Sequence, residues 1–377
     1  MNKYIFSFVA VIAIVAFAIG AFIFVHYPNN KMIRWKADLG VVSAQYELGE
    51  LYKNGDKILQ DDREAAKWYT LAADQGMAEA QFNIGLMYYN GQGVQQDYGE
   101  AAKWFKLAAN QGLAEAQFNI GLMYDQGQGV QQDYGEAAKW YTLAANQGMA
   151  NAQYNIGNIH LNGQGVQQDY GEAAKWFKLA ANQGMAKAQF NIGLMYYKGE
   201  GVKQDYGEAA KWYTLAAIQG HADAQLNLGL MYDKGQGVQQ DYGEAAKWYT
   251  LAANQGDAQA QFNIGNIHLN GQGVQQDYGE AAKWFKLAAN QGMAEAQFNI
   301  GLMYAEGQGV KQDYSQAAKW FKLAANQGLA GAQYAIGKMY SIGLGVKQDD
   351  NEALKWIRLA ANQGHAEAQK ILKLLKQ

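Results

Sequence analysis

The chain has 377 residues, a formal net charge of -3 and no cysteine. The lack of cysteine excludes disulfides, thiol catalysis and a lipid-modified N-terminal cysteine. The slightly acidic balance gives no electrostatic reason to expect a nucleic acid partner, because such partners are bound by basic surfaces.

The first thirty residues differ from the rest in composition. Residues 4–27 contain no Asp, Glu, Lys or Arg and are almost all apolar. As a helix this run would be ~36 Å long at ~1.5 Å per residue, enough for the ~30 Å hydrocarbon core of a bilayer. We therefore expect one transmembrane helix, which stops at Pro28. The alternative is a signal peptide with Lys3 as its positive start and a cleavage site near Gly20.

The charges around this segment leave its orientation open. Lys3 precedes it, and Lys31, Arg34 and Lys36 follow it. Read strictly, the positive-inside rule keeps the rest of the chain in the cytoplasm. A short charged start followed at once by a long apolar run is typical, instead, of an export signal-anchor.

From Gly40 onward the chain repeats itself, with equivalent glycines such as Gly76 and Gly112 spaced 36 residues apart. A fixed period of this length indicates stacked units, each of which buries its apolar face only against its neighbours. We predict the following division: 1–30, transmembrane anchor or signal segment; 31–39, degenerate half-repeat cap; 40–75, 76–111, 112–147, 148–183, 184–219, 220–255, 256–291, 292–327 and 328–363, nine repeats; 364–377, C-terminal capping helix.

The repeat 76–111 illustrates the first half of the predicted unit. Apolar residues recur at spacings of three and four over 78–89, which indicates an amphipathic helix. Gly85 lies in the middle of this helix, where glycine costs ~1 kcal/mol relative to alanine. Because it recurs in every full repeat, we expect a close helix contact there. The segment Gly91–Val94 is predicted to be a turn.

The second half is predicted to be another helix. Asp97 is the candidate N-cap, and Glu100 three residues later completes a pair like a capping box. Trp104, Phe105 and Leu107 lie on its broad apolar face, and Gly112 follows its end. The predicted fold class is therefore all-α: an α/α solenoid of helix-turn-helix repeats, preceded by one transmembrane helix.

Nine of the ten tryptophans occupy one position of the repeat, and we interpret them as core anchors rather than as a stacking ladder for bases or sugars. They are Trp68, Trp104, Trp140, Trp176, Trp212, Trp248, Trp284, Trp320 and Trp356.

The repeat pattern, taken along 78–112, consists of Ala78, Ala80, Gln81, Gly85, Tyr88, Gly91, Gly93, Val94, Asp97, Ala101, Trp104, Phe105, Ala108, Ala109 and Gly112. It resembles the Sel-one-like repeat, a relative of the tetratricopeptide repeat, and the resemblance covers residues 40–377. It implies a right-handed superhelix used for protein–protein interaction, often as an adaptor or scaffold, with no defined catalytic site. Bacterial members with an N-terminal hydrophobic segment are commonly exported or attached to a membrane.

The sequence offers no catalytic constellation. Some members of this family have been linked to β-lactam hydrolysis, but Ser315 is followed by Lys319, one residue too far for a Ser-x-x-Lys motif. His160 and His268 occupy one position three repeats apart, which is too far for shared metal ligation. We interpret them as replacements of a packed tyrosine. No enzyme activity, cofactor or metal is predicted.

Two positions of the first helix are candidates for binding a partner. One holds a recurrent asparagine, whose amide can both donate to and accept from a peptide backbone laid along a groove. The alternative is hydrogen bonding between repeats. These residues are Asn83, Asn119, Asn155, Asn191, Asn227, Asn263 and Asn299.

The other position changes sign and size from repeat to repeat, which fits selection of a partner but equally an exposed position left to drift. Its residues are Glu79, Glu115, Asn151, Lys187, Asp223, Gln259, Glu295 and Gly331.

We therefore predict a membrane-anchored, non-enzymatic scaffold that holds a protein or peptide partner in the concave groove of the superhelix. Residues 4–27 would span a bacterial inner membrane once, with periplasmic repeats. Alternatives are repeats that face the cytoplasm, a secreted effector or adhesin-like binder released by signal cleavage, and an envelope factor that binds a glycan or an assembly partner. Nucleic acid is not an expected partner.

Overall fold

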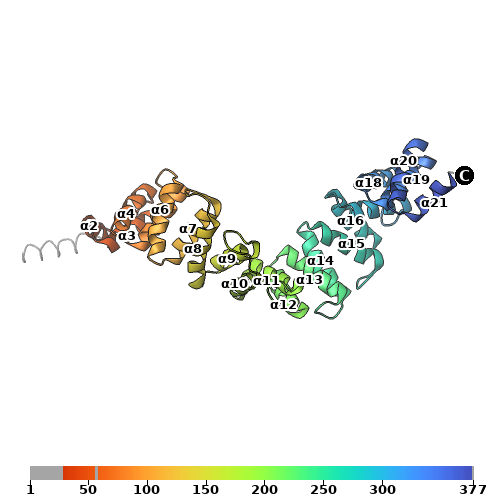
Figure 1. Cartoon of the computed structure of the whole chain (residues 1–377). Helices are drawn as coiled ribbons and strands as arrows, with labels where there is room; N and C mark the ends of the chain where they lie inside the picture. The colour runs from red at the N-terminus through yellow and green to blue at the C-terminus, as the bar shows by residue number, and fades with distance from the viewer. Residues whose placement is uncertain (1–28, 56–57, 376–377) are drawn as a thin grey trace, which may run out of the picture. The chain divides into compact units, whose positions relative to one another are not determined.

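The computed structural model describes residues 29–55 and 58–375, and all regular secondary structure within them is α-helical (Figure 1). Helix α2 (Asn29–Asp38) comes first and α21 (Ala366–Leu374) last. Between them, nine first helices alternate in the described chain with nine second helices. This alternation confirms the predicted all-α repeat with a period of about 36 residues.

The first helices of the repeats are α3 (Val42–Asn54), α5 (Ala78–Asn90), α7 (Ala114–Gln126), α9 (Ala150–Asn162), α11 (Ala186–Lys198), α13 (Ala222–Lys234), α15 (Ala258–Asn270), α17 (Ala294–Glu306) and α19 (Ala330–Ile342). The second helices are α4 (Asp62–Asp74), α6 (Tyr98–Asn110), α8 (Tyr134–Asn146), α10 (Tyr170–Asn182), α12 (Tyr206–Ile218), α14 (Tyr242–Asn254), α16 (Tyr278–Asn290), α18 (Tyr314–Asn326) and α20 (Asp350–Asn362).

The chain forms two compact units, one that ends at Ala180 and one that begins at Ala181. Each unit is built by the same local rule, because consecutive helices pack against one another, as α4 does with α3 and α5 in the first unit and α14 with α13 and α15 in the second. Such nearest-neighbour packing is expected of a repeat array.

The second helices begin at an aspartate cap, as predicted. Asp97 has an extended backbone, and its carboxylate accepts a hydrogen bond from the Glu100 backbone N–H at 3.0 Å. The reciprocal half of the capping box is wrong. The Asp97 N–H donates to the Tyr88 carbonyl instead, and the Glu100 carboxylate forms an ion pair with Lys103.

Gly91 and Gly93, in the turn between the two helices, are required for different structural reasons. Gly91 ends α5 in the left-handed region at φ 70° and donates its N–H to the Met87 carbonyl. Gly93 is also left-handed, at φ 69°, and a Cβ there would lie 2.0 Å from the carbonyl oxygen of Asp62. The second glycine therefore lets the turn approach the start of the second helix in the preceding repeat.

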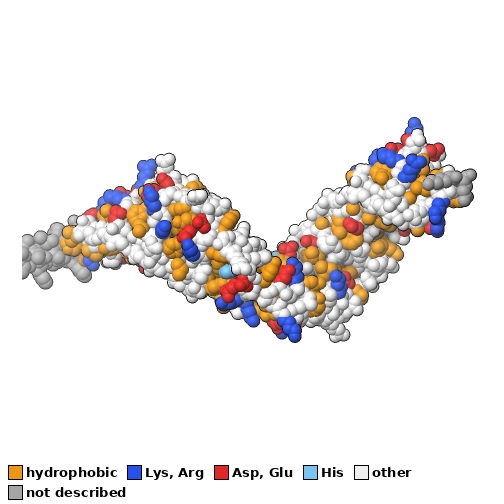
Figure 2. Space-filling view, viewed as in Figure 1, with side chains coloured by type: hydrophobic (Ala, Val, Ile, Leu, Met, Phe, Trp, Pro, Cys, Tyr) orange, Lys and Arg blue, Asp and Glu red, His pale blue; other side chains and the backbone are white. Residues whose placement is uncertain are grey.

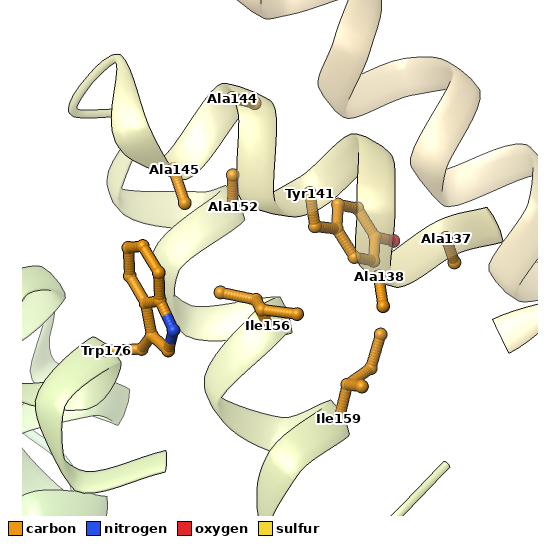
Figure 3. Close-up of a cluster of buried hydrophobic side chains, with 9 residues drawn as sticks. All are labelled: Ala137, Ala138, Tyr141, Ala144, Ala145, Ala152, Ile156, Ile159 and Trp176. Carbon is orange, nitrogen blue, oxygen red and sulfur yellow. The ribbon is translucent and has the colours of Figure 1, made fainter. Parts of the chain in front are cut away.

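The hydrophobic core lies between successive helices rather than in one central layer. In the cluster of Figure 3, Tyr141 of α8 and Ile156 of α9 are buried together with Trp176 of α10. Trp176 thus packs against the first helix of its own repeat and the second helix of the repeat before it. Trp176 is buried, as are Trp68, Trp284, Trp320 and Trp356. The other four of the nine, Trp104, Trp140, Trp212 and Trp248, are half-buried.

The most deeply buried large side chain of the second helix is the one that follows the tryptophan. Phe105 has no exposed surface, and a Cβ on Gly85 would lie 2.8 Å from its ring. This contact confirms the close helix approach expected at Gly85. Leu107, however, was wrongly placed on the apolar face. It is 46% exposed, because only one side of α6 is covered by neighbouring helices.

A buried glutamine links successive repeats. Gln81 of α5 donates through Nε2 to the Ala73 carbonyl at the end of α4 (3.1 Å), and its Oε1 accepts from Nε2 of Gln111 (2.8 Å). Equivalent bonds join Gln297, Ala289 and Gln327. Each amide donates a second hydrogen bond to a helix-end carbonyl that also accepts from the backbone, as Ala73 does from Gly76 N–H.

Among the helices of residues 29–55 and 58–375, none is long and apolar enough to cross a membrane. The predicted transmembrane segment, residues 4–27, lies outside the described residues.

Candidate partner-binding surface

The two predicted binding positions lie together on the first helices, on a surface that we call the first-helix face. The variable position is exposed from Glu79 through Glu295 and half-buried at Gly331. Its charge changes within one unit, from Lys187 to Asp223. The asparagine position lies deeper, with Asn83 buried and the other six half-buried. The two positions therefore differ in what they can offer to a partner.

Asn83 is engaged within the protein. Its Nδ2 donates to Oε1 of Glu50 at 2.8 Å and to the Tyr46 hydroxyl at 3.3 Å, both on the first helix of the preceding repeat. The same Glu50 oxygen accepts from the Tyr69 hydroxyl at 2.5 Å. At this repeat the asparagine forms the inter-repeat hydrogen bonds that the alternative interpretation expects.

Similar polar clusters occur in two other repeats. The Tyr141 hydroxyl donates to Oδ2 of Asp125 at 3.2 Å and also bonds the amide of Asn155. Burial raises the pKa of Tyr141, and the charge of Asp125 raises it further, so the hydroxyl stays protonated. In the second unit, Tyr249 donates to Asp233 at 3.4 Å.

The remaining asparagines vary. Before Asn119, Phe105 stands where other repeats have Tyr69 or Tyr141 and so offers no hydroxyl. Nδ2 of Asn119 donates instead to the Glu115 carbonyl of its own helix at 2.8 Å. Asn263 accepts through Oδ1 from Gln259, and its amide also bonds the Tyr249 hydroxyl. The asparagine position thus serves several local purposes rather than one.

The first-helix face changes character at α19. Here Gly331 stands at the variable position and Ala335 at the asparagine position. Both are small, and an apolar pocket of about 350 Å³ opens beside them. It is lined by Phe298, Leu302, Ala305, Tyr314, Phe321, Gly331, Tyr334, Ala335, Lys338, Met339, Ile342, Leu344 and His365.

The pocket walls are aromatic, and one cation lies at the rim. A Cβ on Gly331 would lie 3.4 Å from Cζ of Phe298, so the glycine leaves this ring uncovered. Tyr334 stacks on His365 with ring centroids 4.4 Å apart, and Nζ of Lys338 lies 5.7 Å from the Tyr334 ring. Ile342 is 65% exposed. An apolar side chain next to an acidic group would match this arrangement.

The serine and the two histidines that the sequence analysis weighed for catalysis or metal binding are not arranged for either. Ser315 donates through Oγ to the capping carboxylate of Asp313 at 2.6 Å. His160 and His268 each have a buried Nδ1 without a hydrogen-bond partner. In residues 29–55 and 58–375 no group of three or more His, Asp or Glu is arranged to hold a metal ion.

Comparison with known families agrees with this architecture. The family model of the Sel1 repeat matches nine consecutive segments: 42–77, 78–113, 114–149, 150–185, 186–221, 222–257, 258–293, 294–329 and 330–365. The chain belongs to the Sel1 repeat family. Its members generally mediate protein–protein interactions, and the fold is typically a non-catalytic scaffold. The matched Sel1 repeats begin two residues after the predicted bounds, since the start of a periodic unit is a matter of convention.

Two solved structures of Sel1-like proteins are similar to this chain. One is c5321, a protective antigen present in uropathogenic Escherichia coli strains, with 33% sequence identity, a TM-score of 0.61 and coverage of 92% of this chain and 90% of that chain. The other is a Sel1 repeat protein from Oxalobacter formigenes, with 35% identity, a TM-score of 0.53 and coverage of 65% and 96%, respectively. No curated protein sequence matches the chain.

The pocket was missed by sequence reasoning, although its signal was present. Gly331 was recognised as the last member of the variable position, and the asparagine series ends at Asn299. The two positions at which a larger side chain is replaced, Gly331 and Ala335, are four residues apart on one helix and so lie on one face. That they uncover Phe298 depends on how α17 packs against α19.

Proposed function

We propose that the protein is a non-enzymatic scaffold that binds a peptide segment of a protein partner along the first-helix face. In this proposal the apolar pocket receives one bulky side chain of that segment. The observation that carries the proposal is the replacement of the larger side chains of other repeats by Gly331 and Ala335, beside an uncovered Phe298.

The dimensions and chemistry of the pocket support a peptide anchor. A volume of about 350 Å³ lies at the lower end of the range found for ligand pockets, and its lining is mostly apolar. Burial of a Leu or Phe side chain is worth roughly 1.5–3 kcal/mol, or about 10- to 100-fold in affinity. Lys338 at the rim would favour an acidic residue beside that anchor.

The exposed variable position supports selection along the rest of the peptide. Lys187 and Asp223, both in the second unit with the pocket, would attract opposite charges on a bound segment. Asparagines of the second unit that are not engaged with a neighbouring repeat would bond the peptide backbone. Asn83, which is buried against Glu50, contributes to stability instead.

We further propose that residues 4–27 anchor the protein in a bacterial inner membrane, with periplasmic repeats. The support is the uncharged apolar run itself. Helix α2 begins at Asn29, so an anchor would hold the first repeat close to the bilayer surface. Mass spectrometry of the mature N-terminus, together with fractionation of cells, tests this part. A chain cut near Gly20 and recovered from the medium would contradict it.

The binding proposal is tested with peptides selected from a random phage-displayed library on the full chain. We expect selected peptides to share a bulky apolar residue next to an acidic one. The double variant Gly331→Glu, Ala335→Asn restores the side-chain types that Glu295 and Asn299 have in the preceding repeat. It should fold normally, fill the pocket and weaken binding of these peptides by about tenfold or more.

The matched control is Glu115→Gly, Asn119→Ala, which removes the same side-chain types from a repeat without the pocket. It should leave the affinity of pocket-selected peptides unchanged. Equal binding of the selected peptides to the pocket-filled variant and to the unaltered chain would refute the proposed site.

A further inference from the structure

Two polar hollows occur one repeat apart in the second unit, apart from the apolar pocket. Hollow A, of about 640 Å³, is lined by Lys286, Tyr304 and Lys311 among others. Hollow B, of about 880 Å³, is lined by the equivalent residues Lys322, Tyr340 and Lys347, and also by Trp356. Every lining residue of hollow A has a counterpart 36 positions later in hollow B, so the repeat geometry produces both.

The pair of lysines distinguishes these hollows from the same place in neighbouring repeats. Where hollow A has Lys286 and Lys311, the repeat before it has Thr250 and Gln275, and the one before that has Thr214 and Gln239. Earlier in the chain, Lys106 stands at the position of Lys286, but Gln131 stands at that of Lys311. Both positions hold lysine once more, at Lys178 and Lys203, but the repeats on either side of that pair have Thr and Gln there. Two consecutive doubled sites therefore concentrate positive charge in one part of a chain with net charge -3.

The carboxylates that line the hollows are largely engaged in local bonds. Asp313 accepts hydrogen bonds from the backbone of Ser315 and Gln316 as a helix cap. Asp349 caps α20 in the same way, accepting from the Asn351 and Glu352 N–H groups.

Glu352 accepts from Nζ of Lys355 at 2.9 Å and from Nε1 of Trp356 at 3.0 Å. Its carboxylate is therefore shared between two donors of its own helix. It forms no ion pair with Lys322 or Lys347 of hollow B in the described structure.

Lys286, Lys311, Lys322 and Lys347 are exposed and form no ion pair within the described residues. Lys355, which also lines hollow B, is instead paired with Glu352. By contrast, the lysine three residues before Lys286, Lys283, pairs with Glu280 on the same helix. Lys322 donates to the Tyr340 hydroxyl at 3.3 Å, a neutral partner that leaves its charge uncompensated. Figure 2 shows Lys and Arg side chains gathered over the region of α18 and α20.

We propose that hollows A and B form a second docking surface, whose ligand is an acidic peptide segment rich in Asp and Glu. Ammonium groups one repeat apart would bind successive carboxylates of one extended segment, which is favoured by multivalency. The inference rests on the proposed function in taking the ligand to be a protein, but it uses different residues. An acidic partner thus gains a contact that the apolar pocket does not provide.

The probe is a fluorescent oligoglutamate peptide, and its binding to the full chain is followed by anisotropy. We expect binding that weakens as salt is raised, because exposed charges are screened. The quadruple variant Lys286→Gln, Lys311→Gln, Lys322→Gln, Lys347→Gln should lower the affinity by tenfold or more. The control Lys106→Gln, Lys139→Gln, Lys211→Gln, Lys247→Gln removes the same charge elsewhere and should change it much less.

A gain of function provides a second test. The double variant Thr250→Lys, Gln275→Lys adds a doubled site directly before hollow A, which makes three in consecutive repeats, and should raise the affinity several-fold. Unchanged binding by both the quadruple variant and this variant would overturn the proposal. An oligogalacturonate of equal charge that binds more tightly than oligoglutamate would also overturn it, and would assign the surface to an anionic glycan.

The two sites can fail separately. Filling the apolar pocket with Gly331→Glu, Ala335→Asn should leave most oligoglutamate binding intact. If the library-selected peptides bind and oligoglutamate does not, only the acidic docking surface is refuted. If oligoglutamate binds and no selected peptide depends on the pocket, the proposed function loses its site while this surface stands.

Discussion

Gly265 of α15 lies against the ring of Phe285 of α16, so closely that a Cβ on the glycine would be 2.8 Å from ring atoms Cδ1 and Cε1. Phe285 has no exposed surface. The same relationship, glycine to a ring twenty residues later, holds at Gly85 and Phe105. It explains why a residue that weakens helices is retained in the middle of each first helix.

Replacement of Gly265 by alanine should destabilise the array. The added methyl group must displace a buried ring, at a cost of about 1–3 kcal/mol, which exceeds the ~1 kcal/mol gained in helix propensity. Urea denaturation, combined with hydrogen exchange of α15 and α16, measures the effect. Gly331→Ala is the control, because its Cβ would meet Phe298 at an ordinary 3.4 Å and should stabilise the protein slightly. Equal shifts in the two variants would contradict this account.

Two asparagines of the same series should respond differently to alanine. Asn83→Ala removes a buried amide from Glu50 and Tyr46, and should cost about 1–3 kcal/mol. Asn119→Ala removes only a bond to a carbonyl of its own helix, and should cost about 0.5 kcal/mol or less. The midpoints of denaturant unfolding test both. If Asn119→Ala loses more unfolding free energy than Asn83→Ala, the inter-repeat hydrogen bond is not the source of the stability that Asn83 provides.

The buried glutamine should matter more than its exposed partner. Gln297→Ala removes a buried amide that bonds both the Ala289 carbonyl and the Gln327 side chain, and we expect a loss of about 1–3 kcal/mol. Gln327→Ala removes a side chain at the surface and should cost less, about 0.5–1.5 kcal/mol. Thermal unfolding of the two variants measures these losses, and we expect the lower midpoint for Gln297→Ala. Amide hydrogen exchange at the end of α16 should also be faster in Gln297→Ala.

Stability should decrease in mild acid because of His221. Burial lowers the pKa of this histidine, Asp223 opposes that shift and Lys187 adds to it, and the ring stacks on Phe190 with centroids 4.7 Å apart. The unfolded chain, with an ordinary pKa of about 6.5, therefore binds the proton more tightly than the folded one. The contribution of His221 is present above that pH and is lost as the pH falls below it.

His221→Met tests this expectation, because methionine occupies the same position at Met77 and Met185. The variant should unfold with a weaker dependence on pH between about 7 and 5 than the unaltered chain. Identical pH dependence in the two proteins would exclude His221 as the cause.

Much of the local structure could be predicted from the sequence because its signals are local. The spacing of apolar residues, the capping Asp97 and the turn that begins at Gly91 each depend on a few neighbouring residues, and all were found where expected. The predicted bond between the Glu100 carboxylate and the Asp97 N–H does not form. Lys103 pairs with the carboxylate, and the Tyr88 carbonyl accepts the bond from the N–H. Leu107 was misplaced because hydrophobicity alone does not tell which side of a helix its neighbours cover.

The candidate site depended more strongly on packing. A recurrent asparagine can bond a partner or a neighbouring repeat, and the choice at Asn83 follows from the presence of Glu50 and Tyr46 on the preceding first helix. Gly331 and Ala335 are visible as departures from the pattern. Only the stacking of α19 beside Phe298 makes them a pocket.

The sequence by itself determined the repeat: its period, its two helices, its turns and the fact that each unit needs neighbours. The tertiary structure decided which polar groups are used up between repeats and where small residues leave a hollow. The physical reason is the distance along the chain between the residues that interact. Helix caps and turns are set by residues a few positions apart, whereas the pairs that define the surface, such as Asn83 with Glu50, meet only after successive repeats have stacked.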